Sequence, residues 1–368
     1  MPLPDNAPEK WELYEHTKVK HQILEKYIKA WFSILGSFNS RLGYFDCFAG
    51  RGIYTDGEPG SPIIVMKAAQ EQMNKINNKV KKFLCAFIEN NPDNYDSLKK
   101  QINHFKSECP DCECFTEFGD FDDVINNFLD ETEDKKLIPA LFFIDPFGWS
   151  GIPFSTIQRI LTHRFSEIIF VLMTYEMARF LKSKPHENSL TTLFGGNEWK
   201  QALRFTGEAR HKAIVQLYWE KIKTDTKAQF VWSFRVNDSE MKKRTKYYII
   251  HACHNIKGLR VMKNLMRKAG SGVFEYLGPE DDVLKYQARF DFYDLESYLL
   301  DHFKGRVISF DGTCDELYPI TDHPVSTYVD SDFRNALKNL EKVGKIQVYR
   351  KTSKTDKGLG GKDLIDFS

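Results

Sequence analysis

Short apolar runs alternate with amphipathic stretches between residues 42 and 173, and this alternation limits the folds open to the chain. The runs have the length of buried strands, and the stretches between them carry apolar residues at helical spacing. The expected strands are 42–47, 82–88, 112–118, 140–145 and 167–173, and the expected helices between them are 62–74, 93–105, 124–129 and 155–163. Strands that alternate with such helices form βαβ units, so the sequence predicts a parallel sheet covered on both faces.

The segments on either side of this alternation complete the predicted domain. An amphipathic helix precedes it, with Val19, Ile23, Tyr27, Trp31 and Leu35 on one face. After it, residues 175–225 form a mostly helical insertion, and 229–236 and 246–253 are β-rich and joined by a polar loop. A mostly parallel sheet that ends in an antiparallel hairpin is the layout of Rossmann-like methyltransferases, and this α/β fold class is the prediction for the chain.

The composition changes near residues 270–281, where Gly, Pro and acidic residues cluster. Helices are expected at 295–303 and 329–343, the second ending at Gly344, followed by β-like pieces at 345–349 and 363–367. This pattern predicts a winged-helix-like domain. The expected domains are therefore 1–275, which is Rossmann-like, and 276–368.

Charge and composition exclude few classes of protein. The 368 residues include 52 Lys and Arg against 51 Asp and Glu, so no overall positive field indicates a nucleic-acid binder. The polar N-terminus has no signal peptide, and no segment reaches the roughly 18 apolar residues of a membrane span. The seven cysteines are an odd number, and several lie in strand-like runs. These features predict a cytoplasmic protein with reduced thiols and no membrane.

Polar and glycine residues follow the predicted strands at the edge where parallel strands hold ligands. After the first strand comes Asp46-Cys-Phe48-Ala49-Gly50-Arg-Gly52, a turn whose glycines permit close backbone approach. The full dinucleotide-binding fingerprint is missing, which disfavours NAD and FAD. Together with the carboxylate segment 145–148 at a later strand end, this turn indicates S-adenosylmethionine (SAM), and Asp46 is expected to meet its ammonium group directly or through water.

The next two strand ends carry further candidate cofactor residues. Glu89 follows the second strand, where a carboxylate suits the ribose hydroxyls. Asp120 and Phe121 follow the third, where they are expected to accept from the adenine amino group and to pack on its ring. Taken singly, each acid is also explained as an ordinary solvated strand end. Their joint order along the chain favours a cofactor site.

The fourth strand runs into Asp145-Pro146-Phe147-Gly148, the predicted catalytic segment. An exocyclic amine must direct its lone pair at the methyl group and then lose a proton. The Asp145 carboxylate and the Pro146 carbonyl can accept both N–H bonds, and Phe147 can stack on a flat base. The alternative is a plain strand-end turn in which Asp145 caps the helix near residue 155 or binds a metal.

Several motifs together resemble the three-Cys-motif partner proteins (TcmP), a family of the SAM methyltransferase class encoded beside a radical-SAM-like protein with three cysteines. The motifs are Lys20-His21, Asp46-x-Phe48-Ala49-Gly50-x-Gly52, Gly57-Glu58-Pro59-Gly60-Ser61-Pro62, Ile144-Asp145-Pro146-Phe147-Gly148 and Arg334-x-x-Leu337-x-x-Leu340-x-x-x-Gly344. Two positions depart from the family pattern: Cys47 stands for a glycine and Arg51 for a proline. The resemblance implies a Rossmann-like SAM-binding domain and the radical-SAM-like protein as a partner.

Two other resemblances suggest the reaction. The Asp-Pro-Phe-Gly tetrad is similar to that of tRNA guanine dimethyltransferases, which act on an exocyclic amine. The loop and first helix resemble a ribosomal-RNA adenine methyltransferase family, in which a helix lysine contacts cofactor or substrate, a role implied here for Lys20. The prediction is a SAM-dependent N-methyltransferase for a base of RNA or DNA. The alternatives are a non-catalytic SAM-binding partner protein, a peptide or small-molecule methyltransferase, and a nuclease with Asp46, Glu89 and Asp145 as metal ligands.

Two other groups of residues have a functional and an ordinary interpretation. Cys109, Cys112 and Cys114 are spaced closely enough to bind a metal, but no second ligand pair follows, and no metal is predicted. Basic residues at 242–246, 260–268 and 351–357, with Arg334 and its neighbours on the last helix, indicate either solvated faces or a track for nucleic-acid phosphates.

Overall fold

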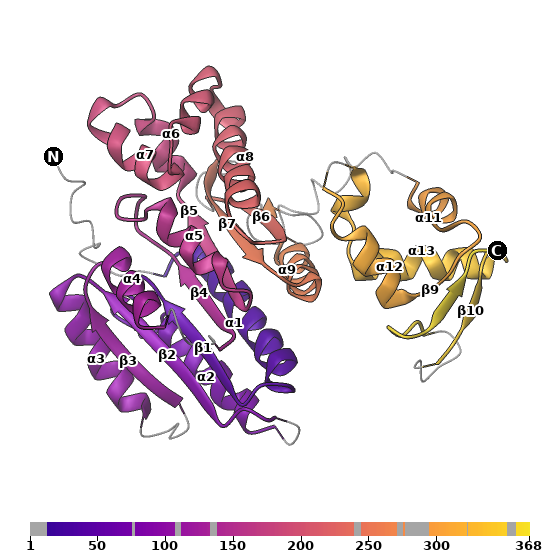
Figure 1. Cartoon of the computed structure of the whole chain (residues 1–368), viewed down its shortest axis with the longest axis horizontal. Helices are drawn as coiled ribbons and strands as arrows, with labels where there is room; N and C mark the ends of the chain where they lie inside the picture. The colour runs from indigo at the N-terminus through magenta and orange to yellow at the C-terminus, as the bar shows by residue number, and fades with distance from the viewer. Residues whose placement is uncertain are drawn as a thin grey trace.

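The computed structural model describes residues 13–75, 78–106, 112–132, 138–238, 244–270, 275–276, 294–321, 323–351 and 358–368. A large α/β unit occupies the N-terminal part of the chain, and a smaller unit follows at the C-terminus (Figure 1). Among the described residues, no helix is both long and apolar enough to cross a membrane.

The large unit contains one sheet whose strand order is β3-β2-β1-β4-β5-β7-β6-β8. The strands are β1 (Arg41–Asp46), β2 (Lys82–Glu89), β3 (Cys112–Phe118), β4 (Ala140–Ile144), β5 (Ser166–Leu172), β6 (Phe230–Asn237), β7 (Thr245–Cys253) and the two-residue β8 (Glu275–Tyr276). The first five are parallel, and β7 runs antiparallel between β5 and β6. This order confirms the predicted Rossmann-like methyltransferase fold.

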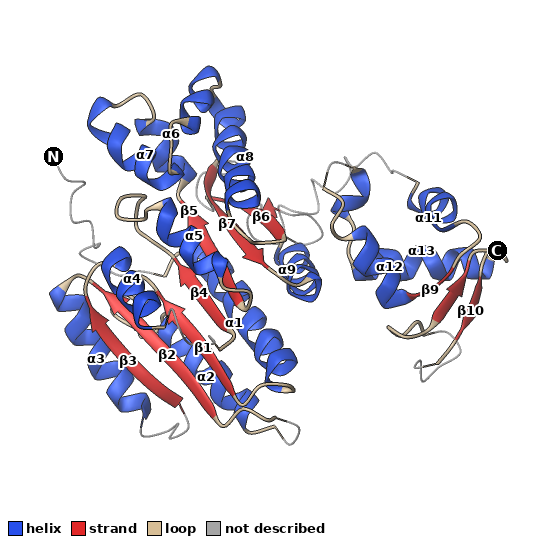
Figure 2. Cartoon of the chain, in the orientation of Figure 1, coloured by secondary structure: helices blue, strands red, loops and turns tan. Residues whose placement is uncertain are grey.

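Helices cover both faces of this sheet (Figure 2). On one face, the sheet packs against the apolar sides of α1 (Glu15–Gly36), α2 (Ser61–Met73), α3 (Pro92–Lys106) and α9 (Ile256–Ala269). On the opposite face, it packs against α4 (Phe121–Glu131), α5 (Phe154–Thr162) and the insertion. All five residues of β4 are buried, as expected for a central parallel strand with apolar layers on both sides.

The insertion between β5 and β6 is helical, as predicted. It comprises α6 (Thr174–Phe180), η1 (Lys184–His186), α7 (Glu187–Phe194), η2 (Glu198–Arg204) and α8 (Gly207–Asp225). Figure 1 shows α6 and α7 beyond the carboxyl end of β5, at the edge where the predicted site residues lie. The insertion therefore borders the site.

The C-terminal unit has the order α11 (Leu295–Phe303), β9 (Val307–Ser309), α12 (Phe310–Leu317), η4 (Pro324–Thr327), α13 (Asp330–Lys342), β10 (Gln347–Tyr349) and β11 (Leu364–Asp366). Its three strands form a separate antiparallel sheet, β10-β11-β9. The sequence did not indicate β9 and α12, because three residues make a weak strand signal and α12 contains Asp311 and Gly312. The domain boundary stays a prediction, and most of residues 270–281 lie outside the described part of the chain.

Two basic residues of α9 bind the C-terminal unit. The sequence had suggested that this basic group either faces solvent or contacts nucleic-acid phosphates, and the structure shows neither role for these two residues. Arg260 donates to both carboxylate oxygens of Asp330 at 2.9 and 2.7 Å and to Asp311 at 2.8 Å. The fully buried Lys263 donates to the carbonyl oxygen of Ser326 at 2.9 Å. These groups are neither solvated nor available to phosphates, because they hold α9 against residues 311–330.

The cysteines differ in part from the predicted reduced set. Cys47, Cys85, Cys114, Cys253 and Cys314 are buried free thiols, as expected. Cys112 is disulfide-bonded, and the prediction was wrong for that residue. Cys109 lies outside the described residues. Within the described ranges, no group of three His, Cys, Asp or Glu side chains is placed to hold a metal.

Candidate functional site

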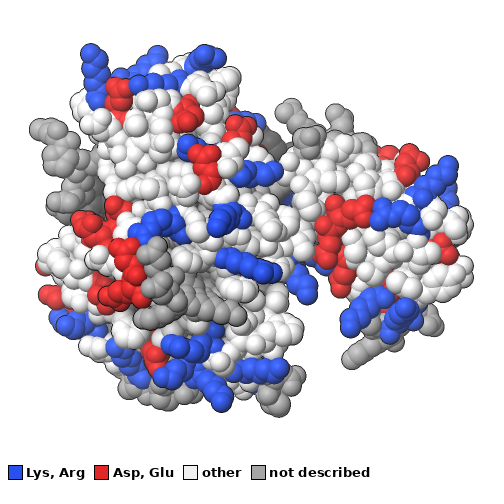
Figure 3. Space-filling view, in the orientation of Figure 1, with Lys and Arg blue, Asp and Glu red and all other residues white. Residues whose placement is uncertain are grey.

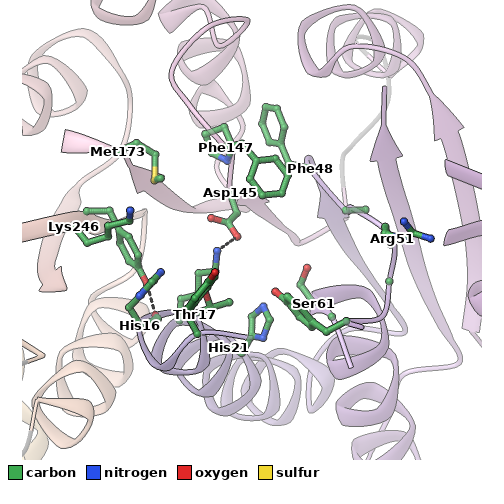
Figure 4. Close-up of a pocket in the computed structure, with 18 of the residues that line it drawn as sticks. His16, Thr17, His21, Phe48, Arg51, Ser61, Asp145, Phe147, Met173 and Lys246 are labelled. Atoms are coloured by element: carbon green, nitrogen blue, oxygen red, sulfur yellow. Dashed lines mark hydrogen bonds and ion pairs between the residues drawn. The ribbon is translucent and has the colours of Figure 1, made fainter. Parts of the chain in front are cut away.

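A cavity of about 290 Å³ opens at the carboxyl ends of β1, β4 and β5, where α1 crosses the sheet edge. It is lined by seven predicted site residues: Lys20, Phe48, Ala49, Gly52, Asp145, Pro146 and Phe147. In Figure 4, Asp145 lies between one side formed by Met173, Lys246 and His16 and another formed by Arg51 and Ser61. The strand ends after β1 and β4 therefore converge on one space, as the sequence predicted.

The turn after β1 presents backbone to this cavity. Gly50 and Gly52 have φ values of 62° and 79°, a region that side-chain-bearing residues rarely adopt. The N–H of Gly60 donates to the carbonyl of Gly52 at 2.9 Å, and a Cβ on Gly60 would lie 3.1 Å from that carbonyl. The loop is thus folded onto the start of α2, where Ser61 and Pro62 begin a helix whose N-terminus favours an anionic group.

Asp46 lies under this loop and not on the cavity wall. Its side chain is fully buried and accepts a hydrogen bond from the Tyr44 hydroxyl at 3.2 Å. Burial raises the pKa of Asp46 to about 7, although hydrogen bonding by Ser61 and Tyr44 opposes the rise. The predicted contact between Asp46 and a cofactor ammonium stays a prediction, because the structure shows this carboxyl supporting the turn.

Glu89, Asp120 and Phe121 lie beside the loop without lining the cavity. Glu89 is 7% exposed, accepts from the N–H of Asn91 at 2.8 Å, and has its pKa raised by burial. Asp120 accepts from Asn90 at 2.9 Å. Phe121 is buried with its ring centroid 5.7 Å from that of Phe48. These three residues border the loop on the β2–β3 side, where their predicted adenosine contacts remain untested.

Replacing Asp46 with asparagine is expected to change how stability depends on pH. The unfolded carboxyl ionises near 3.8 and the folded one near 7, so wild-type stability falls as pH rises through that window and levels off above it. The Asp46→Asn variant lacks this loss and gains up to about 4 kcal/mol relative to wild type between pH 4 and 8. Urea unfolding at both pH values measures this difference, and a constant difference would contradict the assignment.

The carboxylate of Asp145 forms an ion pair with Lys20 of α1, and each side chain is only 15% exposed. The alternative that Asp145 caps the next helix is wrong, because the N-cap residue of α5 is Pro153 and no side chain caps this helix. Phe147 is 55% exposed and borders the cavity, while Gly148 follows outside it. The ion pair with Lys20 holds the Asp145 carboxylate in place on the cavity wall.

The sequence did not indicate several other cavity residues: Tyr14, His16, Thr17, Met173, Glu176 and Tyr247. His21 was noted only as part of the Lys20-His21 motif and Lys246 only as part of a basic group, and neither was predicted to line this cavity. Burial is the main cause that lowers the pKa of His21 to about 3 and of His16 to about 4, so both imidazoles are neutral at physiological pH. Tyr247 donates its hydroxyl to the carbonyl of His16, which ties β7 to α1. The helical spacing of His16, Thr17, Lys20 and His21 was the one available signal for this wall.

Comparisons with known proteins found distant similarity to solved structures and no matching sequence. No protein-family model matches the chain, and no curated protein sequence matches it. A solved Legionella pneumophila protein of the family model DUF519 is 14% identical, with 68% of this chain and 93% of that chain covered and a TM-score of 0.41. The methyltransferase subunit of a type I restriction-modification system from Streptococcus thermophilus is 10% identical over 64% of this chain and 44% of that chain, with a TM-score of 0.32. The fold assignment therefore rests on the strand order.

Proposed function

We propose that the protein is a SAM-dependent methyltransferase that acts on an exocyclic amine of a nucleic-acid base. The observation that carries this proposal is the convergence of the glycine turn after β1 and the Asp145-Pro146-Phe147 segment after β4 on one cavity. These are the strand ends at which open α/β sheets hold their ligands. The resemblance to TcmP proteins, drawn from the sequence motifs alone, belongs to the same proposal.

The residues around the glycine turn fit the proposed cofactor. The close-packed backbone of Gly52 and Gly60 and the N-terminus of α2 suit its amino-acid end, and Glu89, Asp120 and Phe121 lie on the side expected for its adenosine. When bound, SAM supplies an electrophilic methyl group on a sulfonium. The side chains of this chain then have to position the amine and accept the proton that its nitrogen loses.

Asp145 and Pro146 orient the amine in this proposal. The carboxylate accepts one N–H and the Pro146 carbonyl accepts the other, so the nitrogen lone pair points into the cavity. Phe147, exposed at the cavity edge, stacks on the flat base. In the free protein the Lys20 ammonium pairs with this carboxylate, and the amine takes the place of that contact when the base binds.

Lys246 supports a polyanionic substrate at the same cavity. Its side chain is 26% exposed, lies 3.6 Å from Glu176, and is on the opposite side of Asp145 from the glycine turn (Figure 4). On the face drawn in Figure 3, basic and acidic side chains are interspersed, so phosphate contacts are expected locally rather than over a broad patch. Arg244 stands nearby, 4.0 Å from the centre of the Tyr175 ring.

The Lys246→Ala variant is expected to lower the salt dependence of nucleic-acid binding. Each phosphate contact releases condensed counterions, so its loss should reduce the slope of log K against log salt by about 1. The matched control is Lys26→Ala, on the exposed side of α1 away from the cavity. Fluorescence anisotropy across a salt series measures both slopes. Equal slopes for Lys246→Ala and wild type would show that Lys246 does not contact phosphate.

The structure disfavours one of the alternative functions and leaves another open. A nuclease using Asp46, Glu89 and Asp145 is disfavoured, because Asp46 is fully buried and Asp145 is paired with Lys20. A non-catalytic SAM-binding role beside the radical-SAM-like protein remains the second candidate, since it uses the same glycine turn. The winged-helix interpretation of the C-terminal unit is supported by the order α11-β9-α12-α13-β10-β11.

Methyl-labelled SAM incubated with the protein and total cellular nucleic acid tests the proposal. After nuclease digestion, label is expected on the exocyclic nitrogen of one nucleoside. SAM binding without label in any nucleoside, together with a stable complex with the radical-SAM-like protein, would instead favour the non-catalytic role.

A further inference from the structure

A second cavity, of about 190 Å³, lies at the opposite edge of the sheet from the candidate site. It is bounded by the residues that precede β4 and β5, by the end of β7 and the start of α9, and by the second half of α1. The same helix that carries Lys20 into the first cavity places Tyr27 and Trp31 against the second. None of the proposed methyl-transfer residues lies here.

A buried polar cluster forms the floor of this second cavity. The Tyr27 hydroxyl donates to Oε2 of Glu167, and the Nε2 atom of His251 lies 2.9 Å from the Tyr27 oxygen and 3.3 Å from the same Oε2. Tyr27 and His251 are at most 1% exposed, whereas the Glu167 side chain is 12% exposed. Burying such a cluster is costly, and no step of the proposed methyl transfer uses it.

One oxygen of Glu167 is available to a ligand. Both internal contacts go to Oε2, and Oε1 accepts no hydrogen bond within the described part of the chain. Gly258 leaves room in front of it: a Cβ there would lie 3.4 Å from Oε1, 3.3 Å from the Tyr27 hydroxyl and 3.2 Å from the sulfur of Cys253. A single free carboxylate oxygen suits one ammonium group better than it suits a guanidinium or a base edge, because these donate two parallel hydrogen bonds to both oxygens.

The walls and the mouth restrict the rest of the ligand. Trp31, Leu35, Phe165 and Val261 give an apolar and aromatic lining, which also favours an ammonium through its rings. Arg164 and Lys257 also line the cavity and are exposed, which puts them on its solvent side, here called the mouth. An anion would be repelled by Glu167 at the floor, and a cation would be repelled by Arg164 and Lys257 at the mouth. A zwitterion can pair its ammonium with Glu167 and its carboxylate with the two basic residues. The small volume of the cavity excludes ligands of nucleotide size.

We infer that this second cavity binds a small zwitterion of amino-acid size with an apolar or aromatic side chain. The ammonium contacts Glu167, the carboxylate faces Arg164 and Lys257, and the side chain lies against Trp31 and Phe165. This inference does not depend on the proposed methyl transfer, because the two cavities share no lining residue.

Calorimetric titration of the full chain with three probes tests this site. L-Phenylalanine carries both charges, phenethylamine only the ammonium and 3-phenylpropanoate only the carboxylate. L-Phenylalanine is expected to bind at least 10-fold more tightly than either of the others. Equal affinities for the three probes, or no binding of L-phenylalanine, would overturn the inference.

Variants then locate the bound amino acid. Gly258→Ala puts a methyl group over the floor and should weaken L-phenylalanine at least 10-fold, while alanine suits the helix better than glycine and keeps α9 folded. Arg164→Ala, at the mouth, should weaken it as well. Asp145→Asn, at the other edge of the sheet, should leave the affinity unchanged. Loss of binding in Asp145→Asn with full binding in Gly258→Ala would place the ligand in the first cavity and contradict the inference.

Discussion

Replacing Asp145 with asparagine or alanine is expected to lower methyl transfer by about 10²- to 10⁴-fold while SAM binding is kept. The carboxylate accepts the amine N–H and offsets the positive charge that develops on the nitrogen, whereas asparagine keeps the shape of the side chain without its charge. Single-turnover transfer and calorimetry with SAM measure the two properties separately. Affinity for SAM should change little, because the glycine turn and the N-terminus of α2 are intact.

The control for this prediction is Asp123→Asn, in the first turn of α4. It makes the same chemical change at an exposed position outside the cavity. Transfer by this variant should match wild type. If Asp145→Asn also transferred at the wild-type rate, Asp145 would have no catalytic role and the ion pair with Lys20 would be only structural.

Replacing Gly52 with alanine is expected to weaken SAM binding more than 10-fold. Gly52 lines the cavity at a φ of 79°, and an alanine forced into this region costs about 1–2 kcal/mol and moves the turn away from its contact with Gly60. Gly57→Ala is a matched control, because Gly57 has a similar φ of 86° with open space around its Cβ position and lies outside the cavity lining.

Both glycine variants should lose similar stability, and only Gly52→Ala should lose cofactor affinity. Thermal unfolding and calorimetry with SAM separate the two effects. If both variants bound SAM with wild-type affinity, the turn after β1 would not form part of the cofactor site.

The fold and part of the site follow from the sequence because both depend on the parallel strands. Parallel strands bring their carboxyl ends to one edge, so placing Gly52 and Asp145 at strand ends was enough to predict that they meet. The apolar run of β4 was recognisable because a central strand is buried on both faces.

Other parts of the site depend on contacts that no local pattern encodes. Lys246 and Tyr247 reach the cavity because β7 lies antiparallel beside β5, which brings its first residues to the carboxyl edge. The order of the two hairpin strands was not evident from their composition. Lys263 resembles a solvated lysine in sequence, but the Trp232 ring of β6, the Tyr318 ring and the carbonyl of Ser326 surround its ammonium group in the structure.

The most direct test is a crystal structure of the protein with S-adenosylhomocysteine. Its amino-acid end should lie against the backbone of Gly52 and Gly60, and its sulfur should face the Asp145 carboxylate across a space that accepts a flat ring. A molecule bound away from the turn after β1, or a sulfur pointing away from Asp145, would contradict the assignment of this cavity as the methyl-transfer site.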